Sequence, residues 1–330
     1  MRKLIFIILL LVALAACEKM ETAPEEKGET PDFNVKVIAA DDGKIVVIFD
    51  FVSMINAGEE SQSLGDWITG FLKKCKEKKV CPEGSQWRIT ETVNPMLTTL
   101  WDQYQPFNNL CPKLGPNKDL QAPAGCVTCS VAQFLAYHEF PSGLTDYKAI
   151  KNIKNCENRF NIGTAEEKQL AAKFIADIST KDLLDVKYVE IAAGITRGYA
   201  TPLAVVRTLK ALGYENVDLH FGLDVERIVS SLKKGNPVIA SAAGIGVSHG
   251  WVIDGYIKCE LVNPEGQVLD TQYLLHFNWG WNGKNNGYFE PGIIDTREPV
   301  ISDNVNPESR DYIFSFGFNT ITANKPYHAE

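Results

Sequence analysis

The hydrophobic pattern of the chain changes near Gly235, and this change constrains the fold more than any other feature of the sequence. Before that point, apolar residues recur at helical spacing in four segments, 127–138, 165–178, 202–212 and 224–234. After it, β-branched and aromatic runs between Gly, Pro and Asn residues predict five strands, 237–242, 250–257, 272–279, 286–289 and 312–320. Helices followed by strands favour an α+β fold over a doubly wound parallel sheet.

Residues 1–17 have the pattern of a bacterial lipoprotein signal. Arg2 and Lys3 precede an apolar run that is too short to span a membrane, and small residues lead to Cys17. Cys17 would become the lipidated first residue of the mature chain, which predicts a bacterial cell-envelope protein, lipid-anchored in the outer membrane or at the cell surface. An uncleaved membrane anchor is the alternative.

Three further segments follow the signal. Residues 18–32 are rich in Glu, Lys, Thr and Pro, which predicts a flexible tether. Residues 33–84 form a small N-terminal segment, with a predicted hairpin around Asp42-Gly43 and a predicted helix over 67–79. Residues 85–330 form the main domain. The net charge of −8 and the lack of a basic stretch argue against nucleic acid as a partner.

The chain has eight cysteines, of which Cys17 and Cys126 have separate predicted roles. The other six can pair in many combinations, and Cys75 with Cys81 is the favoured local bridge. Cys126 and Cys129 have C-x-x-C spacing, but no second pair or histidine pair completes a zinc site, so we expect no metal and no cofactor. The remaining cysteines are Cys111, Cys156 and Cys259.

Cys126 is the candidate nucleophile. It follows Gly125 and opens an apolar helical run, so its sulfur lies at a helix N-terminus, where unpaired N–H groups favour a thiolate. A packed, inert core thiol is the alternative for this stretch taken alone.

A thiol nucleophile needs a base, and the chain has five histidines. His138 lies on the Cys126 helix itself, His220 lies in a strand-like connector without a supporting motif, and His328 lies in the terminal tail. His249 and His276 remain. His249 is favoured because it follows a glycine-rich loop and has small neighbours, which leave room for a substrate backbone.

Asn278 and Trp279 follow at the end of a predicted strand. An asparagine there can accept a hydrogen bond from the imidazole and fix its tautomer, while the tryptophan shields the pair from water. His249 lies 123 residues and Asn278 lies 152 residues after Cys126, close to the roughly 130–150 residues of papain-like Cys, His, Asn order.

Four sequence blocks resemble those of the streptopain family, secreted bacterial cysteine peptidases of papain-like fold, over roughly Val93 to Pro326. The blocks are Trp101-x-Gln103-x-x-Pro106-Phe107-Asn108, Gly125-Cys126-Val127 with Ala132-Gln133 and Tyr137-His138-x-Phe140-Pro141, His249-x-x-Val252-Ile253-Asp254-Gly255, and Asn278-Trp279-Gly280-Trp281 with Gly287-Tyr288-Phe289. The resemblance implies a helical half that carries the cysteine and an antiparallel β half that carries the histidine and asparagine.

The resemblance also implies a role for each matching residue. Cys126 takes the nucleophile position and His249 the base position. Gln103 falls on the oxyanion-hole glutamine, and the spacing after Trp101 favours it over Gln105. The orienting and shielding positions fall on Asn278 and Trp279, with Gly125 in support.

The sequence departs from the family pattern at three positions. Asp102 replaces a glycine beside the oxyanion glutamine, and Gly250 stands where alanine is common after the histidine. Cys129 replaces a small residue one helical turn after Cys126, so these two thiols could form a regulatory or inactivating disulfide.

The family is made as zymogens, and residues 33–84 occupy the place of the inhibitory propeptide in a shorter form. They are a reduced propeptide or a permanent module, and an inhibitor protein is a further candidate partner. The sequence therefore predicts a lipid-anchored cysteine endopeptidase that acts on proteins or peptides. The resemblance implies that an apolar side chain just before the cleaved residue is preferred. The alternatives are an acyl or glutamyl transferase with the same residues and a catalytically silent binding lipoprotein.

Overall fold

The computed structural model describes residues 10–12, 35–39, 45–49, 84–155, 161–303, 305–306 and 308–327. The chain divides into two compact units, Met1–Lys78 and Lys79–Glu330. In the first unit, strands β1 (Leu10–Val12), β2 (Val35–Ala39) and β3 (Ile45–Phe49) form an antiparallel sheet of order β1-β3-β2. The pairing of β2 with β3 agrees with the predicted hairpin. The predicted helix over 67–79 and the residues Cys17, Cys75, Cys81, Cys156 and His328 lie outside the described part of the chain.

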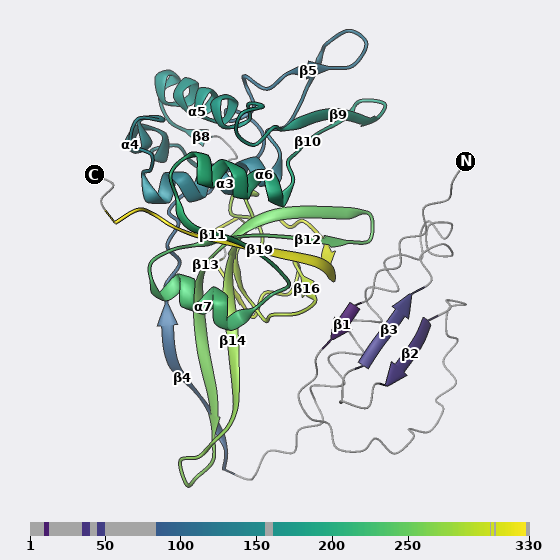
Figure 1. Ribbon diagram of the computed structural model, residues 1–330, viewed down its shortest axis with the longest axis vertical. Helices are drawn as coiled ribbons and strands as arrows, with labels where there is room; N and C mark the ends of the chain where they lie inside the picture. Colours follow the sequence, from purple (N-terminus) through teal and green to yellow (C-terminus); the bar gives the residue numbers. More distant parts are fainter. Residues whose placement is uncertain are drawn as a thin grey trace. The chain divides into compact units, whose positions relative to one another are not determined.

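The second unit is built on an eight-stranded antiparallel sheet (Figure 1). Seven strands run in the order β11 (Glu215–Phe221), β19 (Phe316–Asn324), β12 (Val238–Gly244), β13 (Val247–Val262), β14 (Val268–Asn278), β15 (Gly287–Phe289) and β17 (Ile301–Ser302). The eighth strand, β4 (Gln86–Val93), pairs with β13. Four of the five predicted strand segments lie in this sheet, and the fifth, 312–320, is divided between β19 and a short strand of another sheet, 313–314. Strands β4 and β11 were not predicted.

Except for α4, the helices that the structure describes in the second unit lie where the helical periodicity predicts them. They are α3 (Cys126–His138), α4 (Tyr147–Lys151), α5 (Ala165–Ile178), α6 (Pro202–Ala211) and α7 (Val225–Lys233). Thr201 caps α6 through the Ala204 N–H, and Asp224 caps α7 through the Arg227 N–H. Of these helices, α4 was not predicted. Among the residues that the structure describes, no helix is both long and apolar enough to cross a membrane.

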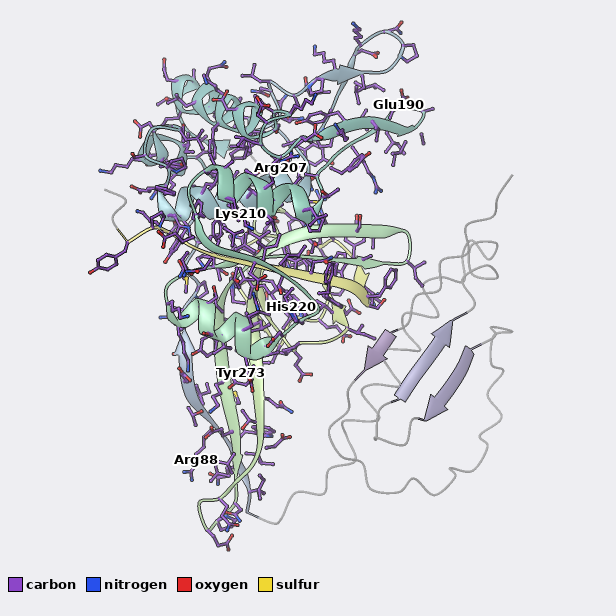
Figure 2. The ribbon with its side chains drawn as sticks, viewed as in Figure 1. Arg88, Glu190, Arg207, Lys210, His220 and Tyr273 are labelled. Atoms are coloured by element: carbon purple, nitrogen blue, oxygen red, sulfur yellow. The ribbon has the colours of Figure 1, made fainter. Side chains whose placement is uncertain are left out.

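Short two-stranded sheets complete the unit. They are β5 (Lys113–Leu114) with β6 (Leu120–Gln121), β7 (Lys154–Asn155) with β8 (Asn161–Ile162), β9 (Lys187–Ala192) with β10 (Ile195–Tyr199), and β16 (Ile294–Asp295) with β18 (Ile313–Phe314). Figure 2 shows Glu190 on the β9–β10 hairpin, which projects beyond α6. The first three pairs are hairpins that were not predicted, whereas β16 and β18 are far apart in sequence and β18 lies within the predicted strand 312–320.

The core has a helical part and a sheet part, and α3 lies between them. Phe134 and Leu135 of α3 pack with α5 residues such as Ile175 in one cluster. Trp251 and Phe277 belong to a second cluster on the sheet. Because α3 also contacts β12 and β13, this helix is held against the central strands of the sheet. The predicted α+β division into a helical half and an antiparallel β half is confirmed.

Candidate active site

Cys126 is the first residue of α3, and the turn before it can be made only with glycine. Gly125 has φ of 97°, and a Cβ there would lie 2.5 Å from the Gly198 carbonyl oxygen. The Ala124 N–H donates to the Gln103 carbonyl at 2.8 Å. The chain segment of the candidate oxyanion residue is therefore fixed two residues before the nucleophile.

The Cys126 sulfur is the acceptor for several backbone N–H groups. Burial raises the pKa of the Cys126 thiol, while the N–H groups of Gly250, Val127 and Cys126 itself, and the charge of Arg197, lower it. Burial outweighs the donors, so the pKa lies above its usual value and the thiol is the resting form. The N–H groups at the helix start thus favour the thiolate, as the sequence predicts, and desolvation opposes it.

Strand β13 brings His249 to the first turn of α3. Gly250 lies against that turn, where an added Cβ would be 3.0 Å from Val127 Cγ2, and its N–H points at the Cys126 sulfur. The small residue after the histidine thus allows close approach of strand and helix. The structure thus places Gly250, the residue after His249, against the helix start that carries Cys126, although Cys126 and His249 lie 123 residues apart in sequence.

The tautomer of His249 follows from one hydrogen bond. Its Nε2 lies 2.7 Å from the Trp279 carbonyl oxygen. A carbonyl can only accept, so Nε2 carries the hydrogen and Nδ1 is the basic nitrogen. The residue that orients the imidazole is therefore Trp279, through its backbone.

Asn278 does not take the orienting role that the sequence predicts for it. Its Oδ1 accepts from Gln133 Nε2 and from the Gly280 N–H, both at 3.2 Å. Its Nδ2 donates to the Thr99 carbonyl at 2.8 Å. The asparagine is placed next to the site, but its side chain is committed to a different network.

Aromatic rings surround His249. The centroid of Trp281 lies 4.4 Å from that of the imidazole, and Trp279, the predicted shield, lies 6.1 Å away. Burial lowers the pKa of His249 to about 3, and the charge of Arg310 lowers it further, while the Trp279 carbonyl raises it. Arg310 lies over the Trp281 ring at 5.5 Å. The imidazole is therefore neutral at rest.

Gln103 is partly exposed, as an oxyanion donor must be, and Gln105 is exposed. Asp102, next to Gln103 in the chain, accepts a hydrogen bond from the Tyr104 N–H at 2.8 Å. Burial raises the pKa of Asp102, while that hydrogen bond and the charges of Arg310 and Lys284 lower it. The carboxyl group is thus held within its own turn.

His276, the other candidate base, has a different environment. Its Nδ1 lies 2.6 Å from Asp254 Oδ1 and its Nε2 lies 3.0 Å from Asp303 Oδ2. Burial lowers its pKa, but the two carboxylates outweigh burial and raise it to about 9. His276 is a buried cation that joins two carboxylates, and it has no free nitrogen for catalysis.

The half-buried His220 lies on β11 (Figure 2).

The cysteines of the described part of the chain are free thiols: Cys111, Cys126, Cys129 and Cys259. Burial and the charge of Asp102 raise the pKa of Cys129 well above its usual value, and its sulfur would lie 3.2 Å from a Cβ added at Gly280. The structure shows no disulfide between Cys126 and Cys129. No cluster of metal-ligating side chains occurs among the residues that it describes.

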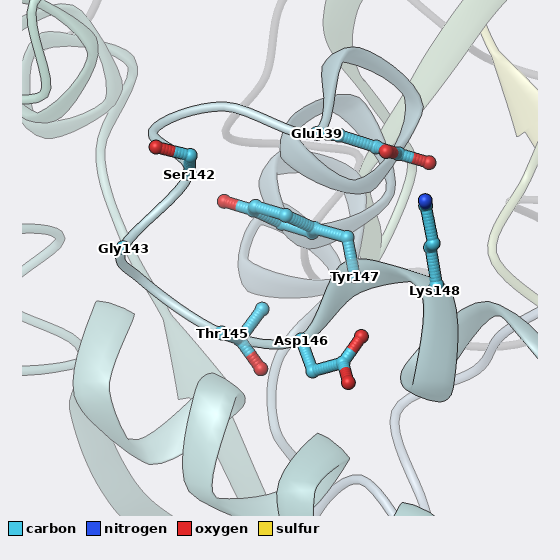
Figure 3. Close-up of a pocket in the computed structure, with 7 residues that line it drawn as sticks. All are labelled: Glu139, Ser142, Gly143, Thr145, Asp146, Tyr147 and Lys148. Carbon is cyan, nitrogen blue, oxygen red and sulfur yellow. The ribbon is translucent and has the colours of Figure 1, made fainter. Parts of the chain in front are cut away.

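A surface pocket of about 570 Å³ opens at the opposite end of α3 (Figure 3). Its lining is Glu139, Ser142, Gly143, Thr145, Asp146, Tyr147 and Lys148. Since α3 has 13 residues, its two ends are about 20 Å apart. This pocket is therefore separate from the Cys126 site.

A cysteine at a helix N-terminus, an imidazole whose tautomer is fixed by a carbonyl, and a glutamine segment bonded to the residues before that cysteine are typical of cysteine-type peptidases. Residues 101–289 match the profile of the peptidase C10 family, and the chain belongs to that family. The predicted streptopain resemblance is confirmed.

Named relatives agree with this assignment. The chain is 26% identical over 316 residues to the thiol protease/hemagglutinin PrtT of Porphyromonas gingivalis, a match that covers 82% of the chain and 34% of the relative. It is 25% identical over 275 residues to streptopain of Streptococcus pyogenes, with 69% of the chain and 64% of the relative covered. The chain thus spans about a third of the first relative and just under two thirds of the second.

A solved structure has a similar fold. A fragment of Prevotella intermedia prointerpain A superposes with a TM-score of 0.50 at 21% identity, covering 78% of this chain and 81% of the fragment. At this identity the match shows the fold. It agrees with the helical and β halves described above.

Proposed function

We propose that the chain is a cysteine endopeptidase with Cys126 as nucleophile, His249 as base and acid, and Gln103 in the oxyanion hole. The observation that carries the proposal is the Trp279 carbonyl at 2.7 Å from His249 Nε2. It leaves Nδ1 as the basic nitrogen of a histidine that β13 delivers to the Cys126 helix. The resting pair is a neutral thiol and a neutral imidazole, so the Cys126 thiol must pass its proton to His249 Nδ1 as the sulfur attacks.

The reaction begins when Cys126 Sγ attacks the peptide carbonyl carbon and His249 Nδ1 takes the thiol proton. The carbonyl oxygen becomes an oxyanion, which the Gln103 side-chain amide and the Cys126 N–H stabilise. The C–N bond then breaks, and the imidazolium gives its proton to the leaving amine. Water, deprotonated by His249, hydrolyses the thioester and restores the thiol.

The N-terminal part of the chain adds a location and a form of control to the proposal. The signal pattern of residues 1–17 supports a lipid anchor on Cys17 and a place in the bacterial cell envelope. Residues 33–84 precede the peptidase domain as an inhibitory propeptide would. The name of the structural relative, prointerpain A, refers to a proform, which supports a zymogen. Proteins or peptides are the proposed substrates.

The test combines a thiol-directed epoxide inhibitor with mass spectrometry on the chain without residues 1–17. Wild type should carry one adduct on Cys126, Cys126→Ala should carry none, and Cys129→Ala, the matched control, should label like wild type. A peptide substrate should yield new N-termini and no amide exchange. An unlabelled Cys126 in reduced, folded protein would overturn the proposal, and amide exchange without hydrolysis would replace it with a transferase.

A further inference from the structure

A closed ring of hydrogen bonds joins three buried polar residues beside the active site. Thr99 Oγ1 donates to Gln133 Oε1 at 2.9 Å, and Gln133 Nε2 donates to Asn278 Oδ1 at 3.2 Å. Asn278 Nδ2 closes the ring on the Thr99 carbonyl at 2.8 Å. Gln133 is fully buried, and the other two are at most 3% exposed.

Two backbone N–H groups fix the direction of this ring. The Trp101 N–H donates to Gln133 Oε1 at 3.3 Å, and the Gly280 N–H donates to Asn278 Oδ1 at 3.2 Å. Because a backbone N–H can only donate, each amide oxygen must face it, and each amide nitrogen must face the next partner. Neither amide can flip without losing two hydrogen bonds.

Each member of the ring lies on a segment that carries one part of the catalytic machinery. Gln133 is on α3, seven residues after Cys126, which is about two helical turns. Thr99 lies four residues before Gln103. Asn278 directly precedes Trp279, whose carbonyl holds His249. The ring is thus the place where the three segments meet.

We propose that Gln133 is a positioning residue that sets the Cys126 helix against both the oxyanion segment and the Trp279 carbonyl. Gln133 touches neither substrate nor the reacting atoms. It acts through Asn278 on the peptide that orients His249, and through Thr99 and Trp101 on the approach to Gln103. This inference deepens the proposed function and rests on it.

The size of the expected effect follows from the geometry. A buried amide that loses its partners leaves unsatisfied polar groups, and the segments shift to find new ones. A displacement of about 1 Å at a reacting group costs roughly a hundredfold in rate. Loss of the ring should therefore reduce turnover far more than it reduces substrate binding.

Two substitutions separate positioning from simple packing. Gln133→Met keeps the size of the side chain but removes every hydrogen bond. In Gln133→Glu, the protonated carboxyl group can still accept from Trp101 and donate to Asn278, whereas the ionised form has no donor for the Asn278 oxygen. Burial raises the pKa of such a group, so this variant should be active in acid and lose activity as the pH rises.

The matched control is Thr128→Val. Thr128 is fully buried on the same helix, and its hydroxyl has no partner among the described residues. This change alters the interior of α3 without touching the ring. It should leave every rate within about twofold of wild type.

The experiment uses the full chain in wild-type, Gln133→Met, Gln133→Glu and Thr128→Val forms. The first readout is the rate of Cys126 alkylation by the neutral reagent chloroacetamide, followed by mass spectrometry from about pH 5 to 9. The second is kcat and KM for a peptide, normalised to titrated active sites. We expect Gln133→Met to lose roughly 10- to 100-fold in kcat at every pH, with slower alkylation and little change in KM.

The decisive result is a loss of activity at alkaline pH in Gln133→Glu that neither wild type nor Gln133→Met shows. This loss must reverse when the sample is acidified. Wild-type alkylation and kcat in both variants across the pH range would overturn the inference, as would an equal loss in Thr128→Val. If wild type labels at Cys126 but cleaves no peptide, the proposed function fails, and the alkylation profile still decides the role of Gln133.

Discussion

The two candidate base histidines, His249 on β13 and His276 on β14, are both buried, yet their surroundings give them opposite properties. His249 is surrounded by tryptophans and bonds one backbone carbonyl, and burial lowers its pKa to about 3. His276 lies between Asp254 and Asp303, which raise its pKa to about 9 despite burial. One imidazole is neutral with a free nitrogen, and the other is a cation without one.

This difference shows that burial alone does not decide what a histidine does. Desolvation acts in the same direction on both rings, but two carboxylates at hydrogen-bond distance outweigh it at His276. Asp254 also accepts from the Leu97 N–H at 2.8 Å. The His276 cluster therefore ties the chain ahead of the oxyanion segment to the sheet, which is a structural role.

The largest effect should come from removing the neutral histidine. His249→Ala deletes the base and acid, so peptidase activity per folded molecule should fall at least about a thousandfold. Urea unfolding should show a far smaller proportional change. Residual activity within tenfold of wild type would mean that His249 is not the base.

Removing the charged histidine should have the opposite profile. His276→Gln leaves Asp254 buried without its cation, and breaking a buried pair costs about 3–5 kcal/mol of unfolding free energy. Asp303→Asn, at a partly exposed partner, is the matched control and should cost less. Activity per folded molecule at low temperature should stay near wild type, and a loss like that of His249→Ala would contradict the division of roles.

The next prediction concerns how His276 makes the free energy of unfolding depend on pH. The folded pKa of His276 is raised from 6.5 to about 9, so its contribution is fully present below about pH 6.5 and is lost as the pH rises through 9. Linkage gives about 3 kcal/mol for this loss. Unfolding in urea at several pH values should show it in wild type, whereas His276→Gln should lack this component.

The smallest effect concerns the charge nearest the neutral histidine. Arg310→Gln removes a positive charge that lowers the pKa of His249, so the acid limb of kcat/KM should move to higher pH. Rates on that limb should fall about two- to threefold. Arg310→Lys, which keeps the charge, should retain the wild-type limb, and an identical shift in both variants would point to lost packing on Trp281.

Local signals made much of the fold predictable. The periodicity over 165–178 and the Thr201 and Asp224 caps predict helices that the structure contains, because these signals act within one or two turns. The strands β4 and β11 were missed, because their stability comes from pairing with β13 and β19 rather than from their own pattern.

The candidate site also has features that the sequence predicts and features that it does not. The sequence by itself determined the Gly125–Cys126 helix start, the order of Cys126, His249 and Asn278, and the family. Tertiary structure decided that the Trp279 carbonyl rather than Asn278 bonds His249, that His276 is a structural cation, and that Gln133 joins the segments of the candidate site. Those outcomes depend on hydrogen bonds between residues 22 to 179 positions apart, and spacing along a chain does not specify which polar atoms meet in the core.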